Sequence, residues 1–417
     1  MSNKESLDQK KRWAIVSIAS IPLVMTLGNS MLIPVLPLLE KKLRITSFQS
    51  SLIITVYSVV AILFIPLAGY LSDKIGRKNV IIPSLILASI GGLISAIASW
   101  KIPDAYWLIL VGRTLQGIGA SGAFPIVLPL VGDLFQSEEE VSTSLGIIET
   151  GNTLGKVLSP ILGAFLGNIS WYLPFFSIPV CCLISILLIS FLVKGPKKQE
   201  APSFKTFIKN VAFTFKINNR WLNSVFFIGG VLMFILFAVL FFLSTILETR
   251  FKIGEVTKGV ILAIPLSVLC LCSYLAGKKI KNSKKTMKWT SFIGICLLSI
   301  SLLILRQSWQ LWVLIGLFSI SAAGIGLTLP CLDALITQGI DKDKRGTISS
   351  LYSSMRFIGV ALGPPAVALL MKSMEKNIFF ILFLLGILAC FVCLFWIRPE
   401  SEHDPAPEEG TIFIRYK

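Results

Sequence analysis

The chain has 417 residues, of which 54% are hydrophobic and only 15% are charged. A soluble domain carries about 25% charged residues, so this composition excludes an ordinary soluble globular protein. The single histidine, His403, lies in a polar segment near the end of the chain, which excludes histidine catalysis and histidine metal sites within the apolar segments.

Apolar runs follow one another along the chain, and each is long enough to cross a bilayer, which needs roughly 20 apolar residues. They lie near 13–36, 50–71, 80–100, 105–131, 142–166, 171–193, 222–247, 258–276, 289–306, 310–336, 346–371 and 377–397. Short polar loops join them, which predicts an all-α integral membrane protein with twelve transmembrane helices. Most of the 39 Lys and Arg residues fall in the termini and in alternate loops. By the positive-inside rule, this pattern predicts that both termini are cytoplasmic, so the net charge of +17 indicates orientation rather than nucleic-acid binding.

The segment from Gly69 to Lys78, GYLSDKIGRK, is a charged stretch between the second and third runs. Its pattern resembles the signature loop between spans 2 and 3 of the major facilitator superfamily of secondary transporters. We expect a tight turn bounded by Gly69 and Gly76, because glycine permits tight turns and close packing. The resemblance implies a gating loop in which Asp73, Arg77 and Lys78 lock the outward-facing state. The alternative is a basic loop that only marks the cytoplasmic side.

Arg113 lies well inside the fourth run, where a charged side chain costs roughly 2.5–3.5 kcal/mol on insertion scales. The sequence R-x-x-Q-G that starts at Arg113 resembles the second motif of the same superfamily. The resemblance implies a role in proton handling or in structural pairing. The alternative is an arginine whose side chain extends to the outer membrane interface.

Small or helix-kinking residues recur along the fifth run at Gly146, Gly155, Ser159, Pro160, Gly163 and Ala164. Their spacing resembles the antiporter motif G-x8-G-x3-G-P-x2-G-G, with serine and alanine replacing two of the glycines. The resemblance implies the drug:proton antiporter branch of the superfamily. Many exporters of that branch have an acidic residue in span 1, where this chain offers only Asn29, so proton coupling falls to an acid elsewhere.

A stripe of polar residues shares the fifth run with this motif: Glu149, Asn152, Thr153 and Lys156. Residues spaced i, i+3, i+4 and i+7 lie on one face of a helix. The second half of the chain repeats the first, since Gly155-x-x-x-Ser159-Pro160 matches Gly359-x-x-x-Gly363-Pro364. This repeat aligns Arg356 with Asn152, on the opposite side of a central cavity.

We expect a substrate cavity lined by Asn29, Glu149, Asn152, Lys156 and Arg356. We assign proton coupling to Glu149, Asp333 and Arg113, because a carboxylate near cations can change protonation as the cavity opens to either side. The alternative for the charged cluster is a static ion-pair network that holds the two halves together. Asp333 is either a second proton or cation site or a cap that faces cytoplasmic water.

The repeat divides the chain into a six-helix bundle at 1–193, a cytoplasmic linker at 194–221, a second six-helix bundle at 222–397 and a cytoplasmic tail at 398–417. Within the linker, the spacing of its apolar residues favours an amphipathic helix on the inner membrane surface over a basic linker with scattered phenylalanines. Pseudo-symmetric halves of this kind place a substrate site near the midplane, at the interface of the repeats.

The resemblance to the drug:proton antiporter branch implies a proton-coupled exporter, an antiporter of small amphipathic molecules such as drugs, that works by alternating access. Within the spans Arg113, Lys156 and Arg356 outnumber Glu149 and Asp333, which favours anionic or zwitterionic substrates. The alternatives are an exporter of one such metabolite, a siderophore or a lipid-like product, and an importer that runs proton symport. The motif in the fifth run argues against import.

We expect neither enzymatic activity nor catalytic residues. The segment Gly151 to Lys156 looks like a phosphate-binding loop, but its spacing is one residue short and Val157 replaces the Ser or Thr of that loop. We therefore expect no cofactor, no metal and no nucleic-acid partner. The expected partners are the amphipathic substrate, protons and membrane lipid, and the expected protein is a monomer in a bacterial plasma membrane.

Overall fold

The computed structural model describes residues 2–135, 138–193, 195, 219–279, 283–306, 310–340 and 342–397. Nearly all of the predicted linker at 194–221, including its predicted amphipathic helix, lies outside the described residues. The predicted tail at 398–417, which contains His403, lies outside them as well.

Every regular element of the described chain is a helix. The first half contains α1 (Ser2–Ser30), η1 (Ile33–Val35), α2 (Leu36–Leu43), α3 (Ser47–Ile75), α4 (Arg77–Lys101), α5 (Tyr106–Ala123), α6 (Val127–Leu134), α7 (Glu138–Ile169) and α8 (Leu173–Leu192). The second half contains α10 (Asn219–Thr249), α11 (Glu255–Lys279), α12 (Lys284–Leu305), α13 (Leu311–Gly339), α14 (Lys342–Ser373), η2 (Glu375–Asn377) and α15 (Ile378–Trp396).

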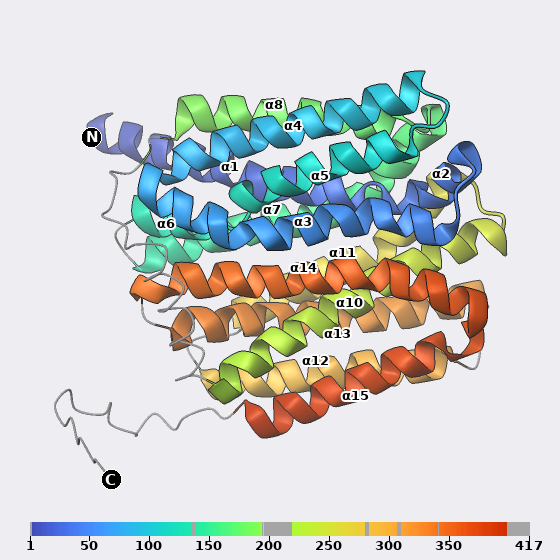
Figure 1. The fold of residues 1–417 in the computed structure, drawn as a ribbon. Coiled ribbons are helices and arrows are strands. Elements are labelled where there is room, and N and C mark those ends of the chain that lie inside the picture. Colours follow the sequence, from blue (N-terminus) through green and yellow to red (C-terminus); the bar gives the residue numbers. More distant parts are fainter. Residues whose placement is uncertain are drawn as a thin grey trace, which may run out of the picture.

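The long helices lie side by side along one direction, and the two halves form separate bundles (Figure 1). The bundles meet mainly where α3 packs against α14 and α7 packs against α11. Helix α1 begins and α15 ends at the same end of the molecule, which we call the terminal end (Figure 1). The opposite end, which carries α2 and η2, is the far end.

The first and fourth apolar runs each fold as two helical pieces. In the first, α1 ends at Ser30 and the short 3-10 helix η1 follows, with Pro34 inside it. In the fourth, Pro125 lies between α5 and α6. Proline lacks the backbone N–H that an α-helix needs at interior positions, so a helix breaks or kinks where proline occurs.

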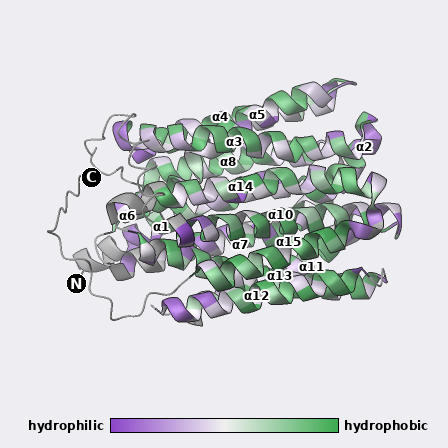
Figure 2. Ribbon diagram, turned by 60° about the horizontal axis from the view of Figure 1, so that its bottom comes forward, coloured by the Kyte–Doolittle hydropathy of each residue, from purple (hydrophilic) through white to green (hydrophobic). Residues whose placement is uncertain are grey.

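The surface of the bundles is apolar, as a lipid environment requires. Phe191, Trp107 and Leu63 are 81%, 72% and 69% exposed, and hydrophobic residues dominate the middle of the helices while hydrophilic ones gather at their ends (Figure 2). Eleven segments of the described chain are long and apolar enough to cross a membrane. Helix α7 is the one remaining long helix of the described chain and is not among these eleven, because its stripe of polar residues lowers its hydropathy. The protein is therefore a multi-pass, all-α membrane protein, as predicted.

Glycine pairs hold neighbouring helices together in both halves. A Cβ on Gly112 of α5 would collide with the carbonyl oxygen of Gly91 on α4. The same relationship recurs in the second half, where a Cβ on Gly324 of α13 would collide with the carbonyl oxygen of Gly294 on α12. Small residues let membrane helices approach closely, and their recurrence in equivalent helix pairs reflects the internal repeat.

Candidate functional site

A cavity of about 70 Å³ lies between the two halves. It is lined by Met25, Thr26, Asn29, Ser30, Tyr57, Phe124, Asn152, Lys156, Met233, Phe237, Ser353, Arg356, Phe357 and Val360. Of the five residues predicted to line a substrate cavity, Asn29, Asn152, Lys156 and Arg356 line this one, and Glu149 does not. Because the lining comes from both halves, a relative movement of the halves changes access to the cavity.

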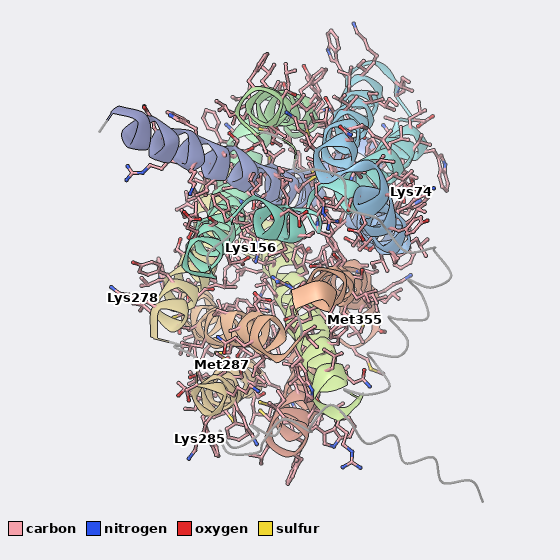
Figure 3. The ribbon with its side chains drawn as sticks, turned by 90° about the vertical axis from the view of Figure 1, so that its left-hand side faces the viewer. Lys74, Lys156, Lys278, Lys285, Met287 and Met355 are labelled. Atoms are coloured by element: carbon pink, nitrogen blue, oxygen red, sulfur yellow. The ribbon has the colours of Figure 1, made fainter. Side chains whose placement is uncertain are left out.

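Lys156 of α7 lies close to the boundary between the two halves, seen from the terminal end in Figure 3. Its side chain is buried, with the residue only 8% exposed. Within the described part of the chain, the ammonium group makes no hydrogen bond and no ion pair. Burying an unpaired cation is costly, so this group is suited to receive an anion from outside the protein.

Arg356 of α14 lines the same cavity from the second half. Its Nη1 lies 3.5 Å from Oδ1 of Asp333 on α13, and its guanidinium carbon lies 5.8 Å from the ring centre of Tyr352. Asp333 is not among the residues that line the cavity. Both members of this ion pair belong to the second half, so the pair does not hold the two halves together.

Glu149 is joined to the cavity through Asn152. The amide nitrogen Nδ2 of Asn152 donates to the two carboxylate oxygens of Glu149 over 3.1 and 3.3 Å. Thr26 of α1 donates to Oδ1 of Asn152 over 2.6 Å. No ion pair joins Glu149 to Lys156 within the described residues, so this part of the cluster is not the static ion-pair network of the alternative interpretation.

Arg113 of α5 is completely buried, which excludes the alternative that it extends to a membrane interface. Its guanidinium donates to four oxygens: Asn29 Oδ1 at 2.6 Å, Gln116 Oε1 at 2.6 Å, the Ile53 carbonyl at 2.8 Å and the Gly28 carbonyl at 3.1 Å. It also lies over the ring of Tyr57, 4.5 Å from the ring centre. These partners are all neutral, so the charge of Arg113 has no carboxylate partner in the described chain.

Aromatic side chains form one wall of the cavity and join the two halves. Phe357 of α14 has its ring centre 6.4 Å from that of Tyr57 on α3 and 6.2 Å from that of Phe124. The sequence does not predict these residues, because 28 phenylalanines are scattered along the chain and no local pattern separates a cavity position from a packing position. Together with the cations, this wall makes the cavity amphipathic.

The predicted loop from Gly69 to Lys78 is mostly helical, which corrects the expected turn. Helix α3 continues to Ile75 and α4 begins at Arg77, so the turn is Gly76 alone, with φ of +101°. Glycine is suited to this backbone conformation because it has no Cβ. Gly69 lies inside α3 with open space around it and has no part in the turn.

The charges around this turn form a network inside the first half. Arg77 makes an ion pair with Asp73. Its Nε also donates to Oδ2 of Asp133, on α6, over 3.0 Å. Lys78 donates to the carbonyl oxygens of Ser190 and Val193 at the end of α8, over 2.8 and 2.7 Å. A cation at a helix C-terminus satisfies carbonyls that have no helical partner. The loop therefore ties the terminal ends of α3, α4, α6 and α8 together.

The predicted antiporter motif packs α7 between α1 and α11. A Cβ on Gly155 would lie 3.0 Å from the Leu23 carbonyl oxygen, and one on Gly163 would collide with the Met31 carbonyl oxygen, both on the α1 side. On the opposite face, Gly259 of α11 packs directly against Pro160 of α7. Ser159 donates to the carbonyl oxygen of Lys156, and Gly146 has no neighbour within 4 Å of a Cβ.

The residues that the structure describes contain no group of three or more His, Cys, Asp or Glu side chains that could hold a metal ion.

Residues 18–364 match the protein family described as the Major Facilitator Superfamily. The chain belongs to the major facilitator superfamily. It is 54% identical over 392 residues to the bacillibactin exporter of Bacillus subtilis (strain 168), which covers 94% of this chain and 98% of that protein. It is 26% identical to the class B tetracycline resistance protein of Escherichia coli, over 84% of this chain and 87% of that protein.

Among solved structures, the fold is similar to that of the human organic anion transporter MFSD10, with a TM-score of 0.74 and 19% sequence identity. The match covers 92% of this chain and 99% of that chain. These comparisons confirm the predicted family and the predicted twelve-helix membrane fold. As a member of this superfamily, the protein is a transporter of small molecules, and its relatives identify it as an exporter.

Proposed function

We propose that this exporter moves small amphipathic anions or zwitterions out of the cell in exchange for protons, by alternating access at the cavity between its halves. The observation that carries the proposal is Lys156, a buried cation that lines the cavity and makes no hydrogen bond or ion pair within the described chain. Arg356 adds a second cation from the opposite half, and Arg113 adds a third behind Asn29. An anionic substrate group would give Lys156 the partner that it lacks.

The amphipathic character of the substrate is supported by the other walls of the cavity. Tyr57, Phe124 and Phe357 present aromatic faces, and the methionines Met25 and Met233 offer flexible apolar surface. Such side chains adapt to ligands of different shapes. The chemistry of these walls therefore suits a molecule with one anionic end and an apolar or aromatic part.

The relatives support two substrate ranges within this proposal. The relative that is 54% identical exports bacillibactin by its name, which favours the alternative of one siderophore-like metabolite. The tetracycline resistance proteins are more distant, at 23–27% identity, and support the broader range of drug-like molecules. The higher identity over nearly the whole chain leads us to favour a bacillibactin-like siderophore.

Proton coupling is proposed for Glu149 and Asp333. Glu149 is linked to the cavity lining through Asn152, and Asp333 is paired with Arg356. Each carboxylate therefore lies one contact away from a residue that can touch the substrate. A change in substrate occupancy can then alter which carboxylate holds a proton, which is the requirement for exchange. Arg113, with its four neutral hydrogen-bond acceptors, is proposed to set the positive potential of the first half.

The orientation of the protein in the membrane, the places of its linker and tail, and its oligomeric state are further parts of the proposal. The terminal end carries most of the basic loops, so we place it and both termini in the cytoplasm of a bacterial plasma membrane. The segment 194–221 is proposed as a cytoplasmic linker on the inner lipid surface, 398–417 as a cytoplasmic tail, and the protein as a monomer. The network of Asp73, Arg77 and Lys78 is proposed to stabilise the cytoplasmic gate.

The test is transport in proteoliposomes with an imposed proton gradient. Bacillibactin, tetracycline and the permanent cation tetraphenylphosphonium are compared for the wild type and for Lys156→Met. We expect gradient-driven transport of bacillibactin that Lys156→Met abolishes. A preference for tetraphenylphosphonium that Lys156→Met leaves intact would overturn the substrate proposal. Accumulation of substrate in the same direction as the protons would support the importing alternative.

A further inference from the structure

A series of ion pairs crosses the boundary between the two halves at the far end. Nζ of Lys41, on α2, lies 2.5 Å from Oε1 of Glu248, on α10. The other carboxylate oxygen of Glu248 lies 2.5 Å from Nζ of Lys258, on α11. Glu255, at the start of α11, lies 2.9 Å from the same ammonium group. Lys41 belongs to the first half and the other three to the second, so the contact of Lys41 with Glu248 joins the halves.

The four side chains differ sharply in exposure. Lys258 is 0% exposed and Glu248 is 8% exposed, whereas Lys41 is 67% exposed. Buried charges must be paired, and Lys258 has two carboxylates for that purpose. If Lys41 moves away with the first half, Glu248 therefore keeps Lys258 as its partner. The contact between the halves can open without leaving a buried charge alone.

Successive turns of α10 lead from the cavity to this contact. Phe237 lines the cavity, and Leu240 lines a smaller apolar pocket next to it, together with Ile33. One turn further, Ser244 donates to the carbonyl oxygen of Ile33 over 3.0 Å, which also joins the two halves. Glu248 lies one turn beyond. The route from the cavity to the far end is thus closed first by apolar and backbone contacts and then by the ion pair.

We propose that Lys41 and Glu248 form the latch that closes the far end, and that Lys258 is the positioning residue that holds Glu248 in place to receive Lys41 at each closure. Under the orientation proposed above, the far end is the outer face, so the latch opens when substrate leaves the cell. This inference makes no assumption about the transported molecule.

The test measures access to the cavity from outside in the absence of substrate. Ser30, which lines both the cavity and the apolar pocket, is replaced in Ser30→Cys, and whole cells are treated with a membrane-impermeant thiol reagent. The protein that keeps Ser30 reports the background from the native cysteines. We expect Lys41→Ala to increase the labelling rate about two- to fivefold, the factor that a partly exposed ion pair contributes. Lys41→Arg should restore the slow rate.

Lys42 supplies two controls, because it is an exposed neighbour of Lys41 and has no ion pair among the described residues. Lys42→Ala should leave the labelling of Ser30→Cys unchanged. Lys42→Cys should itself be labelled from outside, which establishes the orientation independently. If Lys42→Cys is not labelled, the placement of the latch at the outer face is overturned. If Lys41→Ala leaves the rate unchanged, the latch is overturned.

The role of Lys258 is tested by non-additivity. Lys258→Met combined with Glu255→Gln removes one charge of each sign, so Glu248 keeps Lys41 as its partner and the variant remains balanced. We expect this variant to label as fast as Lys41→Ala, although Lys258 does not touch Lys41. Adding Lys41→Ala to it should bring no further increase. The positioning role would be overturned if adding Lys41→Ala multiplied the labelling rate further. It would also be overturned if the variant with Lys258→Met and Glu255→Gln lost folded protein but labelled at the unchanged rate.

Discussion

Arg113 donates a 2.6 Å hydrogen bond to the side-chain oxygen of Asn29 in the interior of the first half. Asn29 also lines the cavity, so a neutral amide lies between a buried guanidinium and the cavity. An amide accepts the hydrogen bond but does not cancel the charge. The field of Arg113 therefore adds to that of Lys156 and Arg356, and this relationship accounts for the preference for anions that we propose.

Replacing Asn29 by aspartate should reverse part of that preference. In Asn29→Asp the new carboxylate compensates Arg113, and at an effective dielectric constant of about 20 such a charge changes the energy of a nearby anion by about 1–2 kcal/mol. We expect roughly tenfold weaker binding of bacillibactin, measured by titration of the purified protein. Asn29→Ser, which adds no charge, serves as the control. Equal losses in both variants would contradict the electrostatic explanation.

Lys156→Met should abolish anion binding without destabilising the fold. Lys156 has no hydrogen-bond or ion-pair partner in the described chain, so its removal breaks no hydrogen bond and no ion pair. Burying a charge that has no partner is costly, so an apolar side chain of similar volume at this position removes that cost. We expect an unchanged or higher Tm together with a loss of binding. Lys156→Arg keeps the charge and should retain part of the affinity; a sharp fall of Tm in Lys156→Met would show that the lysine is structural.

Glu149→Gln should abolish proton-coupled transport and leave the fold intact. A glutamine side chain still offers an oxygen to Nδ2 of Asn152, whereas it cannot bind and release a proton. The measurement is substrate-driven proton flux in proteoliposomes at two pH values. Glu140→Gln, at the partly exposed start of the same helix, is the matched control. If Glu149→Gln keeps the flux and Asp333→Asn loses it, the coupling role passes to Asp333.

Two glycines of the antiporter motif should differ in their tolerance of alanine. A Cβ on Gly163 collides with the carbonyl oxygen of Met31, whereas a Cβ on Gly146 meets nothing within 4 Å. We expect Gly163→Ala to separate α7 from α1, to cost about 1–3 kcal/mol of stability and to lower the transport rate. Gly146→Ala should keep transport and gain up to about 1 kcal/mol from helix propensity. The same Tm for both variants would show that the contact of α7 with α1 is not tight.

The twelve apolar runs and the internal repeat predict the fold correctly because the bilayer imposes a strong and local rule. A span must be long and apolar, and a polar residue inside it is costly, so Arg113, Lys156 and Arg356 stand out in the sequence alone. The internal repeat relates the helices of Lys156 and Arg356, so the sequence also predicted correctly that both residues line one cavity. The family is predicted by short local motifs, such as the one from Gly69 to Lys78, that can be recognised without knowledge of the fold.

Other features depend on contacts between residues far apart in the chain. The motif from Gly69 to Lys78 does not show that its turn is Gly76 alone, and the polar stripe does not show that Glu149 stays behind Asn152 while Lys156 lines the cavity. The contact between Lys41 and Glu248 joins positions 207 residues apart. No helical period or loop pattern encodes such a contact, because it depends on how the two bundles pack. Composition and periodicity therefore decide which helices form, because the bilayer acts on each span by itself. Only the packing of the halves decides which of their polar side chains meet.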